Sequence, residues 1–489
     1  MPVTNLVQLI TYPDSLGGGL ETLDRLLRSR FRGLFPGGTH ILPPFPSSGD
    51  RGFAPLTYAE IDPSFGTWED VQRINEVSPV MLDLMVNHMS RQAPAVQDFL
   101  ARGSQSRYAD LFITPGKVWP KEPPPAADLG KLFLRRDTPF SRYRVAATGE
   151  EVSLWTTFGK EDPSEQVDLD RRSPLYKGFI QEVLEGFQRR GIRTVRLDAV
   201  GYVVKKAGTS CFFVEPEIWG YLEWIRGRAA AAGIELLPEV HAEPALQEAL
   251  SARGFWTYDF ILPYAVLEAL LTGEAAFLRA YLRRRSSRQF TMLDCHDGVP
   301  LKPDLDGLYL SPRARRVVET CVARGANVNR VISASHQDAD GFDVHQIHCS
   351  YYDALGSRDD AMVAARAIQL FAPGVPQVYY AGLLAAGSDH EAVRRTGESR
   401  EINRHNFSSE EIDAAVQRPV VQRLMRLIRL RNEHPAFDGT FAVPDGSDAE
   451  LRLTWTAGPA ECELTVDLPA ANAVVTLTES CGQRVRLAL

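Results

Sequence analysis

Carboxylate and histidine side chains stand at the ends of four short apolar runs, in the motifs DLMVNH (83–88), VRLDAVG (195–201), LLPEVH (236–241) and LDCHDG (293–298). Three of these motifs place a carboxylate directly after an apolar run, namely Asp198, Glu239 and Asp297. Carboxyl groups can attack as nucleophiles, transfer protons and stabilise developing positive charge. A lone Asp after a strand is more often a helix cap or a hydrogen-bonding group of a loop. The ordered set of motifs, rather than any single one, therefore indicates a catalytic site.

Strand-like and helix-like segments alternate along the chain, which is typical of βαβ units and a parallel sheet. Apolar runs predict strands at 5–12, 33–46, 79–88, 194–201, 234–243, 255–263, 289–298 and 374–384. Helical patterns stand between them at 20–31, 68–77, 175–191, 219–233, 361–371 and 420–437. About eight such units predict an α/β protein built on a (β/α)8 TIM barrel, in which catalytic residues lie at the carboxyl ends of the strands.

Two parts of the chain depart from this alternation. Residues 91–167 are rich in Pro and Gly with interspersed aromatic residues, and they predict a loop-rich inserted domain after the third strand. The last part alternates polar and apolar residues and predicts a small C-terminal all-β domain at 436–489. The catalytic barrel is then expected to comprise residues 1–90 and 168–435, with an irregular insertion at about 299–352.

Composition narrows the partners and the surroundings of the protein. The 489 residues are 44% apolar and 24% charged, which is ordinary for a soluble globular protein. A net charge of −8 argues against nucleic acid as the main partner. No stretch approaches the roughly 18–20 apolar residues that span a membrane, and the N-terminus lacks the pattern of a secretory signal.

The cysteine and histidine spacings do not indicate a metal site. The six cysteines are sparse and form no C-x-x-C pair, so they are expected to be free thiols in a reducing cytoplasm. His345 and His348 lie three residues apart, but no carboxylate stands nearby at ligand spacing. We therefore expect a cytoplasmic monomer or homodimer that uses no cofactor and no metal ion.

The four motifs resemble the signature regions of the α-amylase superfamily, and the resemblance covers nearly the whole chain. The matches are D-x-x-x-N-H (Asp83, Asn87, His88), R-x-D (Arg196, Asp198), a strand-end Glu (Glu239) and H-D (His296, Asp297). The resemblance implies that Asp198 is the nucleophile and Glu239 the general acid/base. It also implies that Asp297 stabilises the transition state and that Arg196 keeps Asp198 ionised.

These residue types suit glycosyl transfer with retention of configuration. One carboxylate attacks the anomeric carbon, and a second carboxyl group, about 5–5.5 Å away, protonates the leaving oxygen. The attacking group must stay charged, which a neighbouring cation favours, and the acid must begin protonated, which burial or nearby negative charge favours.

Within the superfamily, the chain most resembles the sucrose phosphorylase subgroup. The stretches that carry this resemblance are LPPFPSSGDRGFAPLTY (42–58), RLDAVGYVVKKAGTSCF (196–212), FAPGVPQVYYAGLLAA (371–386) and REINRHNF (400–407). The resemblance implies that a pocket for one glucosyl unit is lined by Asp50, Phe53, His88, His296 and Arg400. Asp50 also lies in a Ser/Gly-rich stretch, where it could equally be a turn residue.

Two further segments match the acceptor loops of this subgroup: FLRRDTPF (133–140) and GFDVHQIHCSYY (341–352). Arg136, Asp343 and Gln346 match the usual residues, whereas Arg135 and His345 stand where typical sucrose phosphorylases have Pro and Tyr. Relatives that act on sucrose 6′-phosphate are similar to this chain at both positions. Arg binds phosphate through a planar fork of donors, and a protonated His can add a second charged hydrogen bond. We therefore expect phosphorolysis of sucrose 6′-phosphate, with the sugar phosphate and inorganic phosphate as the small-molecule partners.

Several alternatives remain open. Arg135 could be a solvated side chain, with a neutral His345 that packs in the place of Tyr; the chain would then prefer unphosphorylated sucrose. A carboxylate would also suit Arg135, which leaves glucosylglycerate or glucosylglycerol as the sugar substrate. Water or a sugar could resolve the glucosyl-enzyme in place of phosphate, as in a hydrolase or a transglucosylase. A catalytically inactive binding protein on the same fold is the remaining alternative.

Overall fold

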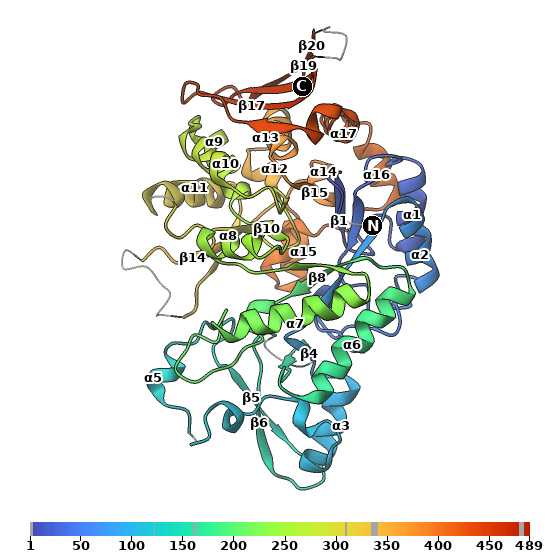
Figure 1. Cartoon of the computed structure of the whole chain (residues 1–489), viewed down its shortest axis with the longest axis vertical. Helices are drawn as coiled ribbons and strands as arrows, with labels where there is room; N and C mark the ends of the chain where they lie inside the picture. Colours follow the sequence, from blue (N-terminus) through green and yellow to red (C-terminus); the bar gives the residue numbers. More distant parts are fainter. Residues whose placement is uncertain are drawn as a thin grey trace.

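The structure is a computed structural model that describes residues 3–121, 123–159, 162, 164–308, 311–333, 341–478 and 484–489. Figure 1 shows an elongated molecule with the C-terminal strands at one end, an inserted group of elements at the other, and the barrel between them.

Eight strands, all paired in parallel, form the central sheet. In chain order they are β1 (Gln8–Thr11), β2 (Gly38–Ile41), β3 (Val80–Met85), β8 (Thr194–Asp198), β9 (Glu235–Pro238), β10 (Thr257–Asp259), β11 (Gln289–Thr291) and β15 (Val375–Tyr379). Their order in the sheet is β10-β11-β15-β1-β2-β3-β8-β9, and the edge strands β9 and β10 contact each other, so the sheet is a nearly closed barrel. Each strand lies within a segment predicted from an apolar run, and the predicted (β/α)8 fold is confirmed.

Helices cover the outside of the barrel and leave the strands buried on both faces, as parallel sheets require. The longer ones are α1 (Leu20–Arg28), α2 (Trp68–Val77), α6 (Pro174–Arg189), α7 (Glu217–Ala231), α8 (Pro244–Ala252), α9 (Leu262–Thr272), α10 (Ala276–Arg284), α13 (Asp359–Phe371) and α17 (Pro419–Glu433). Local sequence explains several helix starts. Thr67 and Asp70 form a capping box at α2, and the Ser173 hydroxyl accepts from the Leu175 N–H at α6.

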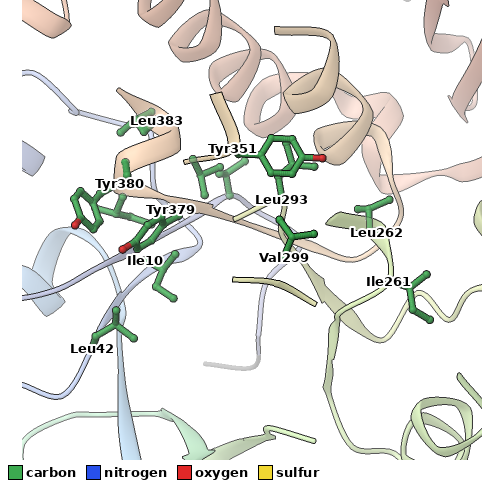
Figure 2. Packing of buried hydrophobic residues seen from close by; sticks show 14 of the residues in the cluster. Ile10, Leu42, Ile261, Leu262, Leu293, Val299, Tyr351, Tyr379, Tyr380 and Leu383 are labelled. Carbon is green, nitrogen blue, oxygen red and sulfur yellow. The ribbon is translucent and has the colours of Figure 1, made fainter. Parts of the chain in front are cut away.

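The core joins the first and last barrel strands. Ile10 of β1 pairs in register with Tyr379 of β15, and both are buried. Figure 2 shows Tyr379 and Tyr380 beside Ile10, with Leu293 and Val299 on the neighbouring segment. Because strands from both ends of the sequence pack here, the barrel depends on contacts between residues more than 350 positions apart.

The chain between β3 and β8 forms the inserted elements. They are β4 (His88–Ser90), α3 (Pro94–Arg102), α4 (Pro115–Val118), α5 (Ala126–Leu129), the hairpin of β5 (Phe140–Arg144) and β6 (Glu151–Trp155), and β7 (Gln166–Asp168). Strand β4 pairs antiparallel with β7, so His88 lies opposite Asp168. The buried Lys205, which follows β8, places Nζ 2.8 Å from Asp168 Oδ2 and ties this insertion to the barrel. The boundaries proposed for the domains stay predictions.

Residues 299–352, expected to be irregular, contain regular elements. These are α11 (Ser311–Ala323) and an antiparallel sheet of β12 (Val299–Pro300), β14 (Val344–His348) and β13 (Asn327–Arg330), in that order. The shortness of these strands explains why no periodic pattern reveals them in the sequence.

Three short α-helices lie between β15 and α17, namely α14 (Tyr380–Leu383), α15 (His390–Thr396) and α16 (Ser409–Ala415), and a fourth, α12 (Tyr351–Ala354), precedes α13. The chain ends in a five-stranded antiparallel sheet of β16 (Thr440–Ala442), β17 (Glu450–Ala457), β18 (Ala460–Asp467), β19 (Asn472–Thr478) and β20 (Arg484–Ala488). Trp455 of β17 is buried and donates from Nε1 to the Phe371 carbonyl at the end of α13, which fastens this sheet to the barrel. None of the described helices is long and apolar enough to cross a membrane.

Candidate active site

The three predicted carboxylates meet at the carboxyl ends of the barrel strands. Asp198 is the last residue of β8, Glu239 directly follows β9, and Asp297 lies on the segment after β11. This is the end of a (β/α)8 barrel at which enzymes of this fold place their catalytic groups.

Arg196 joins the carboxylates of neighbouring strands. Its side chain is 3% exposed, and it contacts Asp198 at 3.0 Å, Glu239 at 2.8 Å and Asp83 of β3. Asp83 also pairs with His40 Nε2 at 2.7 Å. Arg196 points inward because residues alternate along β8, and its cost of burial is offset by three carboxylate partners.

Asp198 and Glu239 respond to this environment in opposite directions. Burial and the negative charge of Glu239 raise the pKa of Asp198 well above its ordinary value. Burial also acts to raise the pKa of Glu239, but Arg196 and His241 outweigh it and lower that pKa to about 2. Glu239 accepts from the Ala199 N–H at 3.1 Å as well. Arg196 contacts both carboxyl groups, so Asp198 and Glu239 titrate as one coupled pair that shares its proton and its charge.

A second arginine, Arg400, binds two carboxylates beside Asp198 and Glu239. Arg400 donates from Nη1 to Asp297 Oδ1 and from Nη2 to Asp50 Oδ1, each at 2.8 Å. Arg404 lies 3.8 Å from Asp50 and 3.9 Å from Asp297. Burial would raise the pKa of Asp50, but Arg400 and Arg404 lower it below its ordinary value. Asp50 and Arg51 both adopt left-handed backbone angles, with φ of 49° and 47°. The backbone is therefore strained at the position where the Asp50 carboxylate binds Arg400.

Two neutral histidines and an aromatic ring line the space next to Asp198. The Phe53 and His296 rings stack at 5.0 Å between centroids, with 5° between their planes. His88 Nε2 donates to the Phe53 carbonyl at 3.1 Å and lies 4.0 Å from Asp198 Oδ2. Burial lowers the pKa of His88 and brings that of His296 to about 3, so both imidazoles are neutral near pH 7. Neutral imidazoles can donate to and accept from sugar hydroxyls.

Arg135 and His345, which stand 210 positions apart, are in direct contact. Arg135 Nη1 lies 2.7 Å from His345 Nε2, and His345 Nδ1 donates to the Lys302 carbonyl. Because a neutral imidazole carries one N–H, His345 Nε2 accepts the bond from Arg135. Burial and Arg135 lower the pKa of His345 well below its ordinary value. The imidazole is therefore neutral in this arrangement and orients Arg135, and the role of His345 toward a sugar phosphate stays a prediction.

The other predicted acceptor residues contact different partners. Arg136 donates to Glu165 Oε1 and Thr156 Oγ1, both at 2.9 Å. Asp343 pairs with Arg330 at the edge of β14. Gln346 Oε1 lies 3.3 Å from His348 Nε2. Arg136 lines one small pocket with Arg135, but Asp343 and Gln346 contact residues of β13 and β14 rather than this pair.

Two further residues of the site were not identified from the sequence. His241 Nε2 lies 3.4 Å from Glu239 Oε1, and His241 Nδ1 lies 3.2 Å from Asp304 Oδ2. The position of His241, two residues after Glu239 in an extended segment, is a signal that could have placed it on the same side of the chain. No sequence pattern marks Asp304, which lies in the segment after β12.

Two sets of side chains bring potential metal ligands together within 4.8 Å: Cys295, His296 and Asp297, and Glu239, His241 and Asp297. In both sets Asp297 is already engaged by Arg400, and Glu239 is engaged by Arg196. Arginine is always charged, so a divalent cation would meet repulsion as well as carboxylates at this position.

Comparison with known proteins gives a consistent result. Residues 36–217 match the catalytic domain of the α-amylase family. The chain is 54% identical, over 486 residues that cover 99% of each sequence, to the sucrose 6(F)-phosphate phosphorylase of Thermoanaerobacterium thermosaccharolyticum. It is 41% identical, over 92% of each sequence, to the sucrose phosphorylase of Streptococcus mutans.

A solved structure agrees with the computed one over its full length. The crystal structure of sucrose 6F-phosphate phosphorylase from Thermoanaerobacter thermosaccharolyticum superimposes with a TM-score of 0.98 at 54% identity, and the match covers 100% of this chain and 99% of that one.

Proposed function

The chain belongs to the α-amylase family, in its group of sucrose phosphorylases, and we propose that it cleaves sucrose 6′-phosphate with inorganic phosphate. The products are α-glucose 1-phosphate and fructose 6-phosphate. The identity of 54% over the full chain to a protein named for this substrate supports the proposal.

The reaction proceeds by double displacement. Asp198 attacks the anomeric carbon of the glucosyl unit while Glu239 donates a proton to the departing fructosyl oxygen. Phosphate then attacks the glucosyl ester of Asp198, Asp198 leaves as a carboxylate, and Glu239 recovers the proton from phosphate. Two inversions at the same carbon give net retention.

The remaining residues hold the glucosyl unit and stabilise its charge. Asp297 stabilises the positive charge on the oxocarbenium-like sugar. Asp50 and Arg400 bind its hydroxyls at the closed end of the pocket, together with His88 and His296. The two hydrogen bonds of Arg400, to Asp50 and to Asp297, support this role because they place three charged groups around one small volume.

The single observation that carries the choice of substrate is the contact between Arg135 and His345. These are the two departures from ordinary sucrose phosphorylases, and they are joined at 2.7 Å although Arg135 lies in the segment before β5 and His345 lies in strand β14. Within the part of the chain that the structure describes, Arg135 has no carboxylate partner, whereas Arg136 pairs with Glu165. An oriented and uncompensated guanidinium is suited to bind a phosphate group with two parallel hydrogen bonds.

The proposal is tested by phosphorolysis of sucrose and of sucrose 6′-phosphate at matched concentrations, with release of glucose 1-phosphate as the measured quantity. We expect a preference of tenfold or more for the phosphorylated sugar, which corresponds to about 1.4 kcal/mol of transition-state binding. Equal rates, or a preference for sucrose, would refute the assignment of Arg135 and His345 to a sugar phosphate. Activity on glucosylglycerate alone would instead assign Arg135 to a carboxylate.

The cytoplasmic location and the choice between a monomer and a homodimer stay predictions. The five cysteines in the described part of the chain are free and buried, which supports a reducing compartment. Cys481 lies outside the described residues.

A further inference from the structure

A buried carboxylate stands behind the histidine that contacts Glu239. Asp304 lies in the segment that follows β12, and its side chain is 0% exposed. Its Oδ2 atom is 3.2 Å from His241 Nδ1, and the opposite ring nitrogen of His241 is 3.4 Å from Glu239 Oε1. The three side chains therefore form a chain of contacts that ends on the carboxyl group proposed as the general acid/base.

The ring of His241 is held in one orientation by its other neighbours. It stacks on Phe260, with 3.9 Å between ring centroids and 20° between the planes, and its centroid is 6.0 Å from that of His345. His241 thus lies between Glu239 and the side chains that face the acceptor. Since both of its nitrogens face carboxylates, both are donors, and the ring is an imidazolium.

Asp304 supplies a negative charge that keeps the buried His241 protonated. Burial would lower the pKa of His241, but Asp304 and Glu239 raise it to about 10. Among the described residues, Asp297 and His345 also face His241; Asp297 is ionised and His345 is neutral. Glu239 exchanges its proton during each catalytic cycle and Asp297 is held by Arg400, so Asp304 is the carboxylate that faces His241 Nδ1 throughout the reaction.

We propose that Asp304 is a positioning residue for the reaction: it holds His241 as an oriented imidazolium between Glu239 and the acceptor. When the first displacement leaves Glu239 ionised, this cation stabilises the carboxylate, and it presents positive charge to an incoming phosphate. Asp304 touches no reacting atom and acts through His241. The inference rests on the proposed function in that phosphate is taken as the acceptor, but it does not depend on which sugar is cleaved.

The test uses α-glucosyl fluoride as the glucosyl donor, because fluoride leaves without a proton from Glu239. The measured quantity is kcat/KM for inorganic phosphate in Asp304→Asn and in the wild type as a function of pH. Dividing kcat/KM of Asp304→Asn by that of the wild type at each pH gives a ratio from which the titration of phosphate itself cancels. Without Asp304, burial is opposed by Glu239 but no longer by a carboxylate at Nδ1, so the pKa of His241 falls from about 10 and the ring loses its proton at a lower pH than in the wild type. We expect the ratio to fall about tenfold between about pH 6 and pH 9, the change that a drop of about two units in the pKa of His241 produces over that range.

Three companion variants make the result specific. Asp304→Glu retains the carboxylate and should restore a ratio that does not vary with pH. His241→Gln leaves no ring to titrate, so its ratio should be low and constant, and Asp304→Asn should approach it at high pH. Asp294→Asn removes a buried carboxylate that pairs with Arg366 at 3.0 Å, and it controls for general damage to the barrel.

The outcomes separate the inference from the proposed function. A ratio for Asp304→Asn that is reduced but independent of pH would overturn the inference and leave Asp304 with a structural role. If Asp304→Asn does not fold, Asp304→Ser is judged by the same criterion. A wild-type enzyme whose release of fluoride is not accelerated by phosphate would instead refute the proposed phosphorolysis, whatever the variants show.

Discussion

Replacement of Arg135 by alanine should convert a preference for the phosphorylated sugar into near indifference. Arg135 donates to the neutral His345 and has no ion-pair partner among the described residues, so its charge is available to a ligand. A hydrogen bond between charged groups contributes about 1.5–3 kcal/mol. At about 1.4 kcal/mol per factor of ten, kcat/KM for sucrose 6′-phosphate should fall roughly 10- to 150-fold. Unphosphorylated sucrose lacks the group that Arg135 binds, so its kcat/KM should change by less than about threefold.

The assay measures initial rates of glucose 1-phosphate release from both sugars at saturating phosphate. Arg142→Ala is a matched control, because Arg142 is an exposed arginine on strand β5 of the same insertion. Arg135→Lys should give an intermediate loss, since lysine retains the charge but not the planar fork. Equal losses on both sugars would show that Arg135 supports the loop or a shared step. No loss on either would show that it does not bind the sugar phosphate.

Three further variants probe the remaining contacts. Arg400→Lys replaces the planar fork that bridges Asp50 and Asp297 with one ammonium group, so kcat/KM should fall about 10- to 100-fold on both sugars. A loss confined to the phosphorylated sugar would contradict this role. Glu239→Gln should lower kcat on sucrose 6′-phosphate by about 10²- to 10⁴-fold but spare fluoride release from α-glucosyl fluoride, because fluoride leaves without a proton from Glu239. An equal loss on both substrates would argue against an acid role. Lys205→Met leaves the buried Asp168 unpaired and should lower the free energy of unfolding by about 3–5 kcal/mol in urea titrations, whereas a change below about 1 kcal/mol would argue against the pairing.

The barrel was predictable because its strands are buried on both faces. A strand such as β8 must be apolar except at the residues whose side chains reach the active site. A run like TVRLD therefore reveals both the strand and the positions of its functional residues. The rule that catalytic groups lie at the carboxyl ends of strands then brings Asp198, Glu239 and Asp297 together without any knowledge of distances. The antiparallel pairing of β12, β13 and β14 escaped detection because short strands carry no measurable period.

Contacts between segments far apart in the chain could not be predicted from the sequence in the same way. Asp304 and His241 are 63 positions apart, and neither motif nor spacing joins them. The state of His345 depends on a backbone carbonyl, that of Lys302, which accepts from Nδ1 and so leaves Nε2 to receive Arg135. Such states follow from the geometry of hydrogen bonds rather than from residue type.

The distribution of charge across the site gives a physical reason for an anionic acceptor in both half-reactions. On the glucosyl side, the arginines are matched by carboxylates: Arg196 contacts three of them and Arg400 contacts two. On the acceptor side, the described contacts leave Arg135 against a neutral imidazole, next to the imidazolium of His241. A neutral glucosyl unit therefore meets arginines that are all paired with carboxylates, whereas fructose 6-phosphate and inorganic phosphate meet Arg135, which has no carboxylate among its described contacts. Since charges in a low dielectric interact strongly, this asymmetry favours phosphate over water as the species that reaches the glucosyl-enzyme.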